Sequence, residues 1–250
     1  MTLRSALPLA LLLATSASAL PPVTGFTLKN GMKVRFLVDR TVPQVAVNLW
    51  VRVGSKDEAP GRSGFAHLFE HLMFMGTERV PNGQYDRIME AEGATNNATT
   101  AEDRTNYYSS GPSSVLPTLL WLEADRLDAL GRNIDLAKLN LQRDVVKNER
   151  RQNVEDTPHG RADELLNGLL FPKGHPYDHS VIGSMRDLSA ASVADVRGFF
   201  ATYYVPSNVT LLVAGDFDPT KVRPLVERLF GGLAATPAPA PRKAIPVPVR

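Results

Sequence analysis

Residues 65–76 read FAHLFEHLMFMG, an apolar run that carries three ionisable side chains. The apolar positions cover most of the circumference of a helix, so the pattern predicts a buried helix over 65–75 that is closed by Gly76 as a C-cap. His67 and His71 are four residues apart, and both imidazoles therefore project from the same face of that helix. Two nitrogen ligands on one face can share a single metal ion.

Glu70 lies between the two histidines, close to their face of the helix but offset from it. Its carboxylate can reach a metal-bound water without taking a ligand position, which is the arrangement of the inverted zincin motif HxxEH. Ionisable groups in such an apolar helix are costly to bury unless a partner compensates them, and a divalent cation would do so. The alternative is a histidine hydrogen-bonded to a carbonyl, with Glu70 at a solvated edge.

A catalytic zinc ion usually takes three protein ligands, so two histidines leave one ligand to be found. The chain has no cysteine, and the third ligand must therefore be His, Asp or Glu. A helix is predicted over 136–154, and on its mostly apolar face Glu149 follows Gln142 and Val146 at helical spacing. From the pattern alone, Glu149 is either the missing ligand or an ordinary exposed glutamate, and base rates of burial favour the second.

The rest of the chain predicts an α+β fold with a mainly antiparallel sheet and helices packed on it. Alternating runs at 33–37 and 45–53 predict two strands that we expect to be neighbours in that sheet. Further strands are predicted over 105–109 and 209–214, whereas the polar segment 95–100 has a weaker strand pattern. Beside those already given, helices are predicted over 84–92, 115–130, 161–170, 189–203 and 219–231.

The two ends of the chain differ in composition from the part between them. Residues 1–19 contain one cation, an apolar stretch and a terminal Ala-Ser-Ala, the pattern of a secretory signal peptide, so we expect export to a periplasm or the medium. No other stretch is long and apolar enough to cross a bilayer. The formal charge of +2 over 250 residues does not favour nucleic acid as a partner. Five prolines among residues 237–248 predict an extended linker.

Several motifs together resemble the N-terminal half of a pitrilysin-type zinc peptidase, the family of insulin-degrading enzyme and the mitochondrial processing peptidases. They are HLFEH at 67–71, MGT at 75–77, NNATT at 96–100, RDVVKNERRQ at 143–152, FP and HPY within 171–177, and AGD at 214–216. The resemblance implies that His67, His71 and Glu149 hold one zinc ion per chain. It implies that Glu70 is the general base on a zinc-bound water.

The same resemblance implies a metalloendopeptidase that hydrolyses peptide bonds of extended polypeptides. In the family the substrate adds as a strand to an exposed sheet edge near the metal, and Asn97, Ala98 and Thr99 match that edge. Backbone pairing of this kind selects for extended shape more than for sequence. An ordinary polar loop is the alternative interpretation of these three residues.

Two features depart from the family pattern. Gln142 stands seven residues before Glu149, where members often carry a second glutamate. Members are also built from two related halves, and this sequence stops where the second would begin. We therefore predict a signal peptide at 1–19, a catalytic domain at 20–233, and at 234–250 a linker to a second half, either the rest of a longer chain or a partner subunit. The competing interpretation is a metal-binding but inactive half that captures peptides or stabilises a partner.

Overall fold

The computed structural model describes residues 21–240 and 245–246. The predicted signal peptide lies outside the described residues. Residues 234–240 of the predicted linker are described, and they contain no helix or strand. Within the described part of the chain, no helix combines the length and the apolar character that a membrane span requires.

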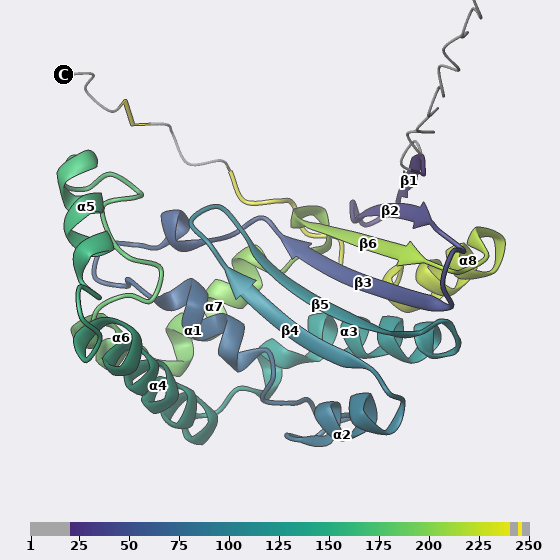
Figure 1. Ribbon diagram of the computed structural model, residues 1–250, viewed down its shortest axis with the longest axis horizontal. Coiled ribbons are helices and arrows are strands. Elements are labelled where there is room, and N and C mark those ends of the chain that lie inside the picture. The colour runs from purple at the N-terminus through teal and green to yellow at the C-terminus, as the bar shows by residue number, and fades with distance from the viewer. Residues whose placement is uncertain (1–20, 241–244, 247–250) are drawn as a thin grey trace, which may run out of the picture.

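A single six-stranded sheet forms the centre of the molecule (Figure 1). Its strands are β1 Val23–Thr27, β2 Lys33–Val38, β3 Gln44–Val51, β4 Thr95–Thr100, β5 Thr105–Pro112 and β6 Val209–Gly215. They lie side by side in the order β1-β2-β6-β3-β5-β4, and every neighbouring pair is antiparallel except β2 and β6. The predicted α+β class with a mainly antiparallel sheet is confirmed.

The prediction that β2 and β3 are neighbours was wrong, because β6 lies between them. In β6 the residues Val209, Leu211 and Val213 are fully buried, and the strand is paired along both edges. Hydrophobic alternation determines which face of a strand is buried, but it carries no information about which strand lies beside it. The polar segment 95–100 is a strand after all, at one edge of the sheet.

Eight α-helices are described, together with short turns of other helical types. The α-helices are α1 Phe65–Leu72, α2 Gln84–Ala91, α3 Leu116–Asn133, α4 Leu136–Arg150, α5 Ala162–Leu170, α6 Met185–Ala190, α7 Val193–Tyr203 and α8 Pro219–Phe230. A π-helical turn over Arg151–Glu155 follows α4, and 3₁₀ turns lie at Ser55–Asp57, Ser113–Val115 and Pro206–Asn208.

The helix predicted over 189–203 is two helices in the structure. Ser189 lies inside α6, where its hydroxyl donates to the carbonyl of Met185. The cap of α7 is Ser192, whose hydroxyl accepts from the amide of Asp195 while the Asp195 carboxylate accepts from the amide of Ser192. This reciprocal capping box begins a new helix, because it satisfies amide groups at the helix start that would otherwise lack partners.

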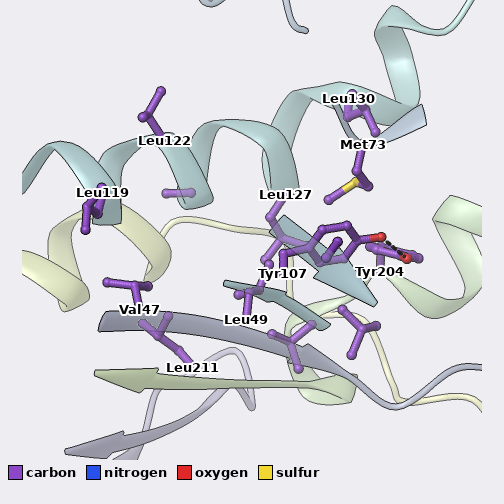
Figure 2. Packing of buried hydrophobic residues seen from close by; sticks show 14 of the residues in the cluster. Val47, Leu49, Met73, Tyr107, Leu119, Leu122, Leu127, Leu130, Tyr204 and Leu211 are labelled. Carbon is purple, nitrogen blue, oxygen red and sulfur yellow. Dashed lines mark hydrogen bonds between the residues drawn. The ribbon is translucent and has the colours of Figure 1, made fainter. Parts of the chain in front are cut away.

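The core lies between the sheet and α3, which runs along one face of it (Figure 2). Leu119 and Leu127 of α3 point toward Val47 and Leu49 of β3, and all four side chains are buried. Burial of a side chain of this size contributes about 1.5–3 kcal/mol. The helix α1 packs against α4 and against the edge strand β4, which pairs with β5 (Figure 1). The ionisable residues of interest lie here, near the C-terminal end of β4.

Candidate metal centre

The helix that carries both histidines is fixed at its N-terminus by a buried carboxylate. The N-cap residue is Gly64, whose φ of 89° is a left-handed conformation that glycine adopts without strain. Glycine has no capping side chain, and the Glu58 carboxylate takes that role by accepting from the amides of Gly64 at 3.0 Å and Ala66 at 2.7 Å. The α-helix ends at Leu72, and a further turn continues to Gly76, so the predicted end at 75 lies one turn too far.

Three of the predicted site residues come together from two helices. The Nε2 atom of His71 lies 3.3 Å from Oε2 of Glu149, and Nε2 of His67 lies 3.8 Å from the same oxygen. The two imidazole rings are 4.8 Å apart between centroids and nearly perpendicular. One donor atom from each residue lies within 4.8 Å of the other two, and among the described residues no other such group of three is found. The group could therefore hold a metal ion.

The electrostatic state of these groups suits metal binding. Burial, and secondarily the neighbouring His71, lowers the pKa of His67 to about 4, so its ring is neutral at neutral pH. The hydrogen bond from His71 lowers the pKa of Glu149 below its usual value, and that carboxylate is ionised. Neutral imidazole and ionised carboxylate are the forms that bind metal. The Nδ1 atom of His67 is buried without a hydrogen-bond partner among the described residues.

Glu70 lies beside the cluster without joining it. Its Oε2 accepts a hydrogen bond from the hydroxyl of Thr100, the last residue of β4. Burial raises the pKa of Glu70, and the hydrogen bond from Thr100 opposes that rise. Glu70 and Thr100 line one cleft of about 640 Å³, which is also lined by His67, His71 and Glu149. The carboxylate is thus held by one oxygen in the same cleft as the metal-binding group.

The same cleft is lined by the three residues predicted to bind substrate. Asn97, Ala98 and Thr99 belong to β4, which pairs with β5 on one side and, among the described residues, with no strand on the other. The side chains of Asn97 and Thr99 are exposed, whereas Ala98 points into the core. An unpaired edge of this kind can accept an extended chain as a further strand.

Sequence reasoning missed several residues of the cleft. Thr100 stood within the quoted NNATT motif, but a hydroxyl near the end of a polar segment carries no signal of its contact with Glu70. Val181 and Ile182 form an apolar wall from a loop that follows α5, and Phe74 lies in the turn after α1. Gln142 also lines the cleft, and its amide donates to the sulfur of Met75 at 2.8 Å.

The sheet with a His-His-Glu group on two of its helices is typical of a metallopeptidase domain. A family model described as Insulinase (Peptidase family M16) matches residues 34–174, and the chain belongs to this family. A second model, described as Peptidase M16 inactive domain, matches residues 190–250. The resemblance drawn from the motifs is therefore confirmed.

Curated relatives and solved structures agree with this assignment. The chain is 33% identical over 232 residues to the zinc protease PqqE of Helicobacter pylori, covering 92% of this chain and 51% of that protein. The crystal structure of a protease from Helicobacter pylori superposes with a TM-score of 0.82 at 32% identity, covering 92% of this chain and 54% of the other. The first half of the periplasmic protease PqqL from Escherichia coli has the same fold, with a TM-score of 0.82 at 24% identity and coverage of 91% and 49%. The chain spans about half the length of the curated relatives it matches.

Proposed function

We propose that this chain is the catalytic half of a zinc-dependent metalloendopeptidase that hydrolyses extended polypeptides. The observation that carries the proposal is the convergence of His67 and His71 from α1 with Glu149 from α4. The names of the relatives as zinc proteases support the same class of activity. We assign His67, His71 and Glu149 as the ligands of one zinc ion per chain and Glu70 as the general base.

The two donor separations from Glu149 are close to those that zinc requires. Nitrogen and oxygen donors at about 2.0–2.1 Å from a tetrahedral zinc ion lie roughly 3.3 Å apart. The His71–Glu149 separation of 3.3 Å agrees with that value, and the His67–Glu149 separation of 3.8 Å needs a shift of about half an ångström. A His, His and Glu set is one that catalytic zinc sites use. When bound, zinc supplies a Lewis acid that polarises the scissile carbonyl and acidifies a water molecule.

In the proposed reaction, Glu70 moves the protons. Its Oε2 is occupied by the hydroxyl of Thr100, which leaves Oε1 to accept a proton from the attacking water. Because burial raises the pKa of Glu70, the carboxylate is a stronger base than an exposed one and can then pass the proton to the leaving amine. Peptide-bond hydrolysis by this route needs no covalent intermediate.

We propose that β4 binds the substrate. Its free edge would pair with an extended polypeptide through the backbone of Asn97, Ala98 and Thr99, next to the three metal-binding residues. Affinity from backbone hydrogen bonds depends on the substrate being unfolded or flexible. The natural substrate class is therefore extended polypeptide, with the side chains selected by the cleft walls.

Replacing the base tests the assignment. In Glu70→Gln we expect one zinc per chain to remain bound and hydrolysis of a quenched fluorogenic peptide to fall by about 10²–10⁴-fold, because the amide cannot accept the proton. Glu90→Gln, at an exposed position of α2, is the matched control and should keep the parent rate. Cleavage by Glu70→Gln at the parent rate would show that another group is the base. The assay uses the chain together with its second half if the isolated chain is inactive.

A second candidate function follows from the length of the relatives. Since this chain corresponds to about half of each, it can be a metal-retaining half that captures peptide and becomes active only with a second half. One zinc per purified chain without peptidase activity, and activity restored by a co-expressed second half, would favour this candidate.

We also propose that the protein is exported, because residues 1–19 have the pattern of a signal peptide. Among the structural neighbours, PqqL is described as a periplasmic protease. Fractionation of cells that express the full chain, with and without residues 2–19, tests this proposal. Loss of the mature form from the periplasm on deletion is the expected result.

A further inference from the structure

Arg150, the residue directly after the proposed ligand Glu149, is buried where an arginine would ordinarily be exposed. Only 6% of its surface is exposed, although it ends α4 and its neighbour Arg151 lies in solvent. Its guanidinium makes a two-pronged pair with Glu164 of α5, at 2.5 and 3.1 Å, and donates to the carbonyl of Gly183 at 2.7 Å. Fork-shaped pairs of this kind fix geometry as well as charge.

The contact with Glu164 is the principal polar anchor of α5. No residue of α5 is fully buried, and its four leucines are between 51% and 85% exposed. Apolar packing therefore contributes little to holding this helix in place. The Glu164 carboxylate also accepts from the hydroxyl of Ser180 at 2.9 Å, so the loop that carries the cleft wall Val181 and Ile182 is anchored to the same charged pair.

The contact with Gly183 reaches the helix of the two histidines. Gly183 packs so closely on the N-cap of α1 that a Cβ atom added to it would lie 2.3 Å from the carbonyl oxygen of Ser63 and 2.4 Å from Cα of Gly64. The next residue, Ser184, donates its amide to the Ser63 hydroxyl at 3.1 Å. One side chain thus connects the end of α4 to the beginning of α1 through a single loop residue.

We propose that Arg150 is a positioning residue of the metal centre: it holds the end of α4 at a fixed distance from α1, and with it Glu149 within reach of the two imidazoles. The inference rests on the proposed zinc site. Because the carboxylate and the imidazoles come from different helices, a small displacement of one helix would lengthen one metal–ligand distance and weaken binding. Arg150 is none of the proposed ligands or substrate-binding residues, and it acts through Glu164, Gly183 and a longer ion pair with Glu155 at 3.5 Å.

Zinc affinity of the full chain, measured at 25 °C by competition with a chromogenic chelator, tests the proposal. Arg150→Met keeps an unbranched stem in place of the arginine methylenes but removes the charge and every donor. We expect zinc to bind about 10–100-fold more weakly, the usual cost of losing an outer support of a metal site. Glu164→Ala removes the acceptor on α5 and should weaken zinc binding in the same direction. Arg151→Met is the matched control on the neighbouring exposed arginine and should bind zinc as the parent does.

Two further variants separate positioning from a general loss of stability. Arg150→Lys keeps one donor for Gly183 but not the fork, so its affinity should lie between those of the parent and Arg150→Met. The double variant Arg150→Met/Glu164→Ala should lose no more affinity than Arg150→Met alone, because both changes break the same anchor. Circular dichroism confirms that each variant is folded at 25 °C, and Glu164→Ala carries the test if Arg150→Met does not fold.

The result that overturns the proposal is a zinc affinity of folded Glu164→Ala, or of folded Arg150→Met, equal to that of the parent. Failure of the underlying zinc site gives a different result. In that case the parent chain would not bind one zinc, or His71→Ala would bind it as tightly as the parent.

Discussion

His67 shows how the fold prepares one side chain for a metal. The side chain is 14% exposed, and its pKa of about 4 is well below the ordinary value of 6.5. Desolvation disfavours the charged ring, so the protein keeps His67 neutral across the physiological pH range. A metal ion therefore does not have to displace a proton from this ligand when it binds.

The same shift predicts a pH dependence of stability in the metal-free chain. Between pH 6.5 and 4 the unfolded chain binds a proton at His67 and the native chain does not, so the free energy of unfolding falls as pH falls. We expect a loss of about 2 kcal/mol between pH 7.5 and 5 from this residue. Urea unfolding with a chelator present, compared between the parent and His67→Gln, measures it. Equal pH slopes in the two proteins would contradict the assigned shift.

Sequence predicted the residues of the site unequally, for a physical reason. His67, Glu70 and His71 share one helical turn, and helix geometry alone places the two imidazoles together. Glu149 lies on another helix, and its place beside them depends on how α1 and α4 pack, which no local pattern encodes. Only the resemblance to a family selected it. Arg150 stands within the quoted motif RDVVKNERRQ and Ile182 lies outside every quoted motif, but the sequence indicated the role of neither, because both roles arise from a loop that folds back on α1.

At the scale of elements, α1 is the helix on which the site depends. Backbone amides at its start donate hydrogen bonds to a side chain that lies outside the helix. Glu58 lies before the helix and accepts from two of its first amides, since glycine at the N-cap cannot. Its side chain is fully buried. The orientation of α1 is thus set by a residue six positions upstream of its N-cap.

Replacing that residue tests its contribution. Glu58→Gln keeps one acceptor oxygen and loses the other, which leaves a buried amide of Gly64 or Ala66 without its partner. We expect the free energy of unfolding to fall by about 1–3 kcal/mol, the usual cost of an unsatisfied buried group. Guanidinium unfolding of the parent, Glu58→Gln and the exposed control Glu90→Gln measures the difference. A Glu58→Gln midpoint that matches Glu90→Gln would contradict the capping role.

Element prediction succeeded where local chemistry decides and failed where pairing decides. The helix starts predicted at 136 and 219 agree with α4 and α8, which the structure shows to be capped by Asp135 and Asp218. The break between α6 and α7 was missed because Ser189 and Ser192 are both plausible N-cap residues in the sequence. The structure shows that Ser192 is the cap and that Ser189 lies inside α6. Strand order was missed because β6 begins at Val209, 165 residues after β3 begins at Gln44, and no local pattern shows that two strands so far apart in sequence are paired.

For the whole molecule, a metal at the candidate centre would join segments that are far apart in the chain. Zinc that binds the native chain and not the unfolded one should stabilise it by about 2.7 kcal/mol when free zinc is at 100 times its dissociation constant. The midpoint temperature of thermal unfolding should therefore rise when zinc is added and return to its original value when a chelator removes the zinc. His71→Ala, which removes one proposed ligand, should show no such shift. A zinc-induced rise in that variant equal to the parent's would place the stabilising ion elsewhere.

The order of strands has a consequence for how the protein is made. β6 occupies the middle of the sheet, yet it is the last of the six strands to be synthesised. Until β6 emerges, the other strands can form only two separate ribbons, one of β1 and β2 and one of β3, β5 and β4. Each ribbon has an open edge where β6 will pair. A nascent chain shorter than about 215 residues thus lacks the strand that joins the two ribbons, so the six-stranded sheet can form only after most of the domain has been translated.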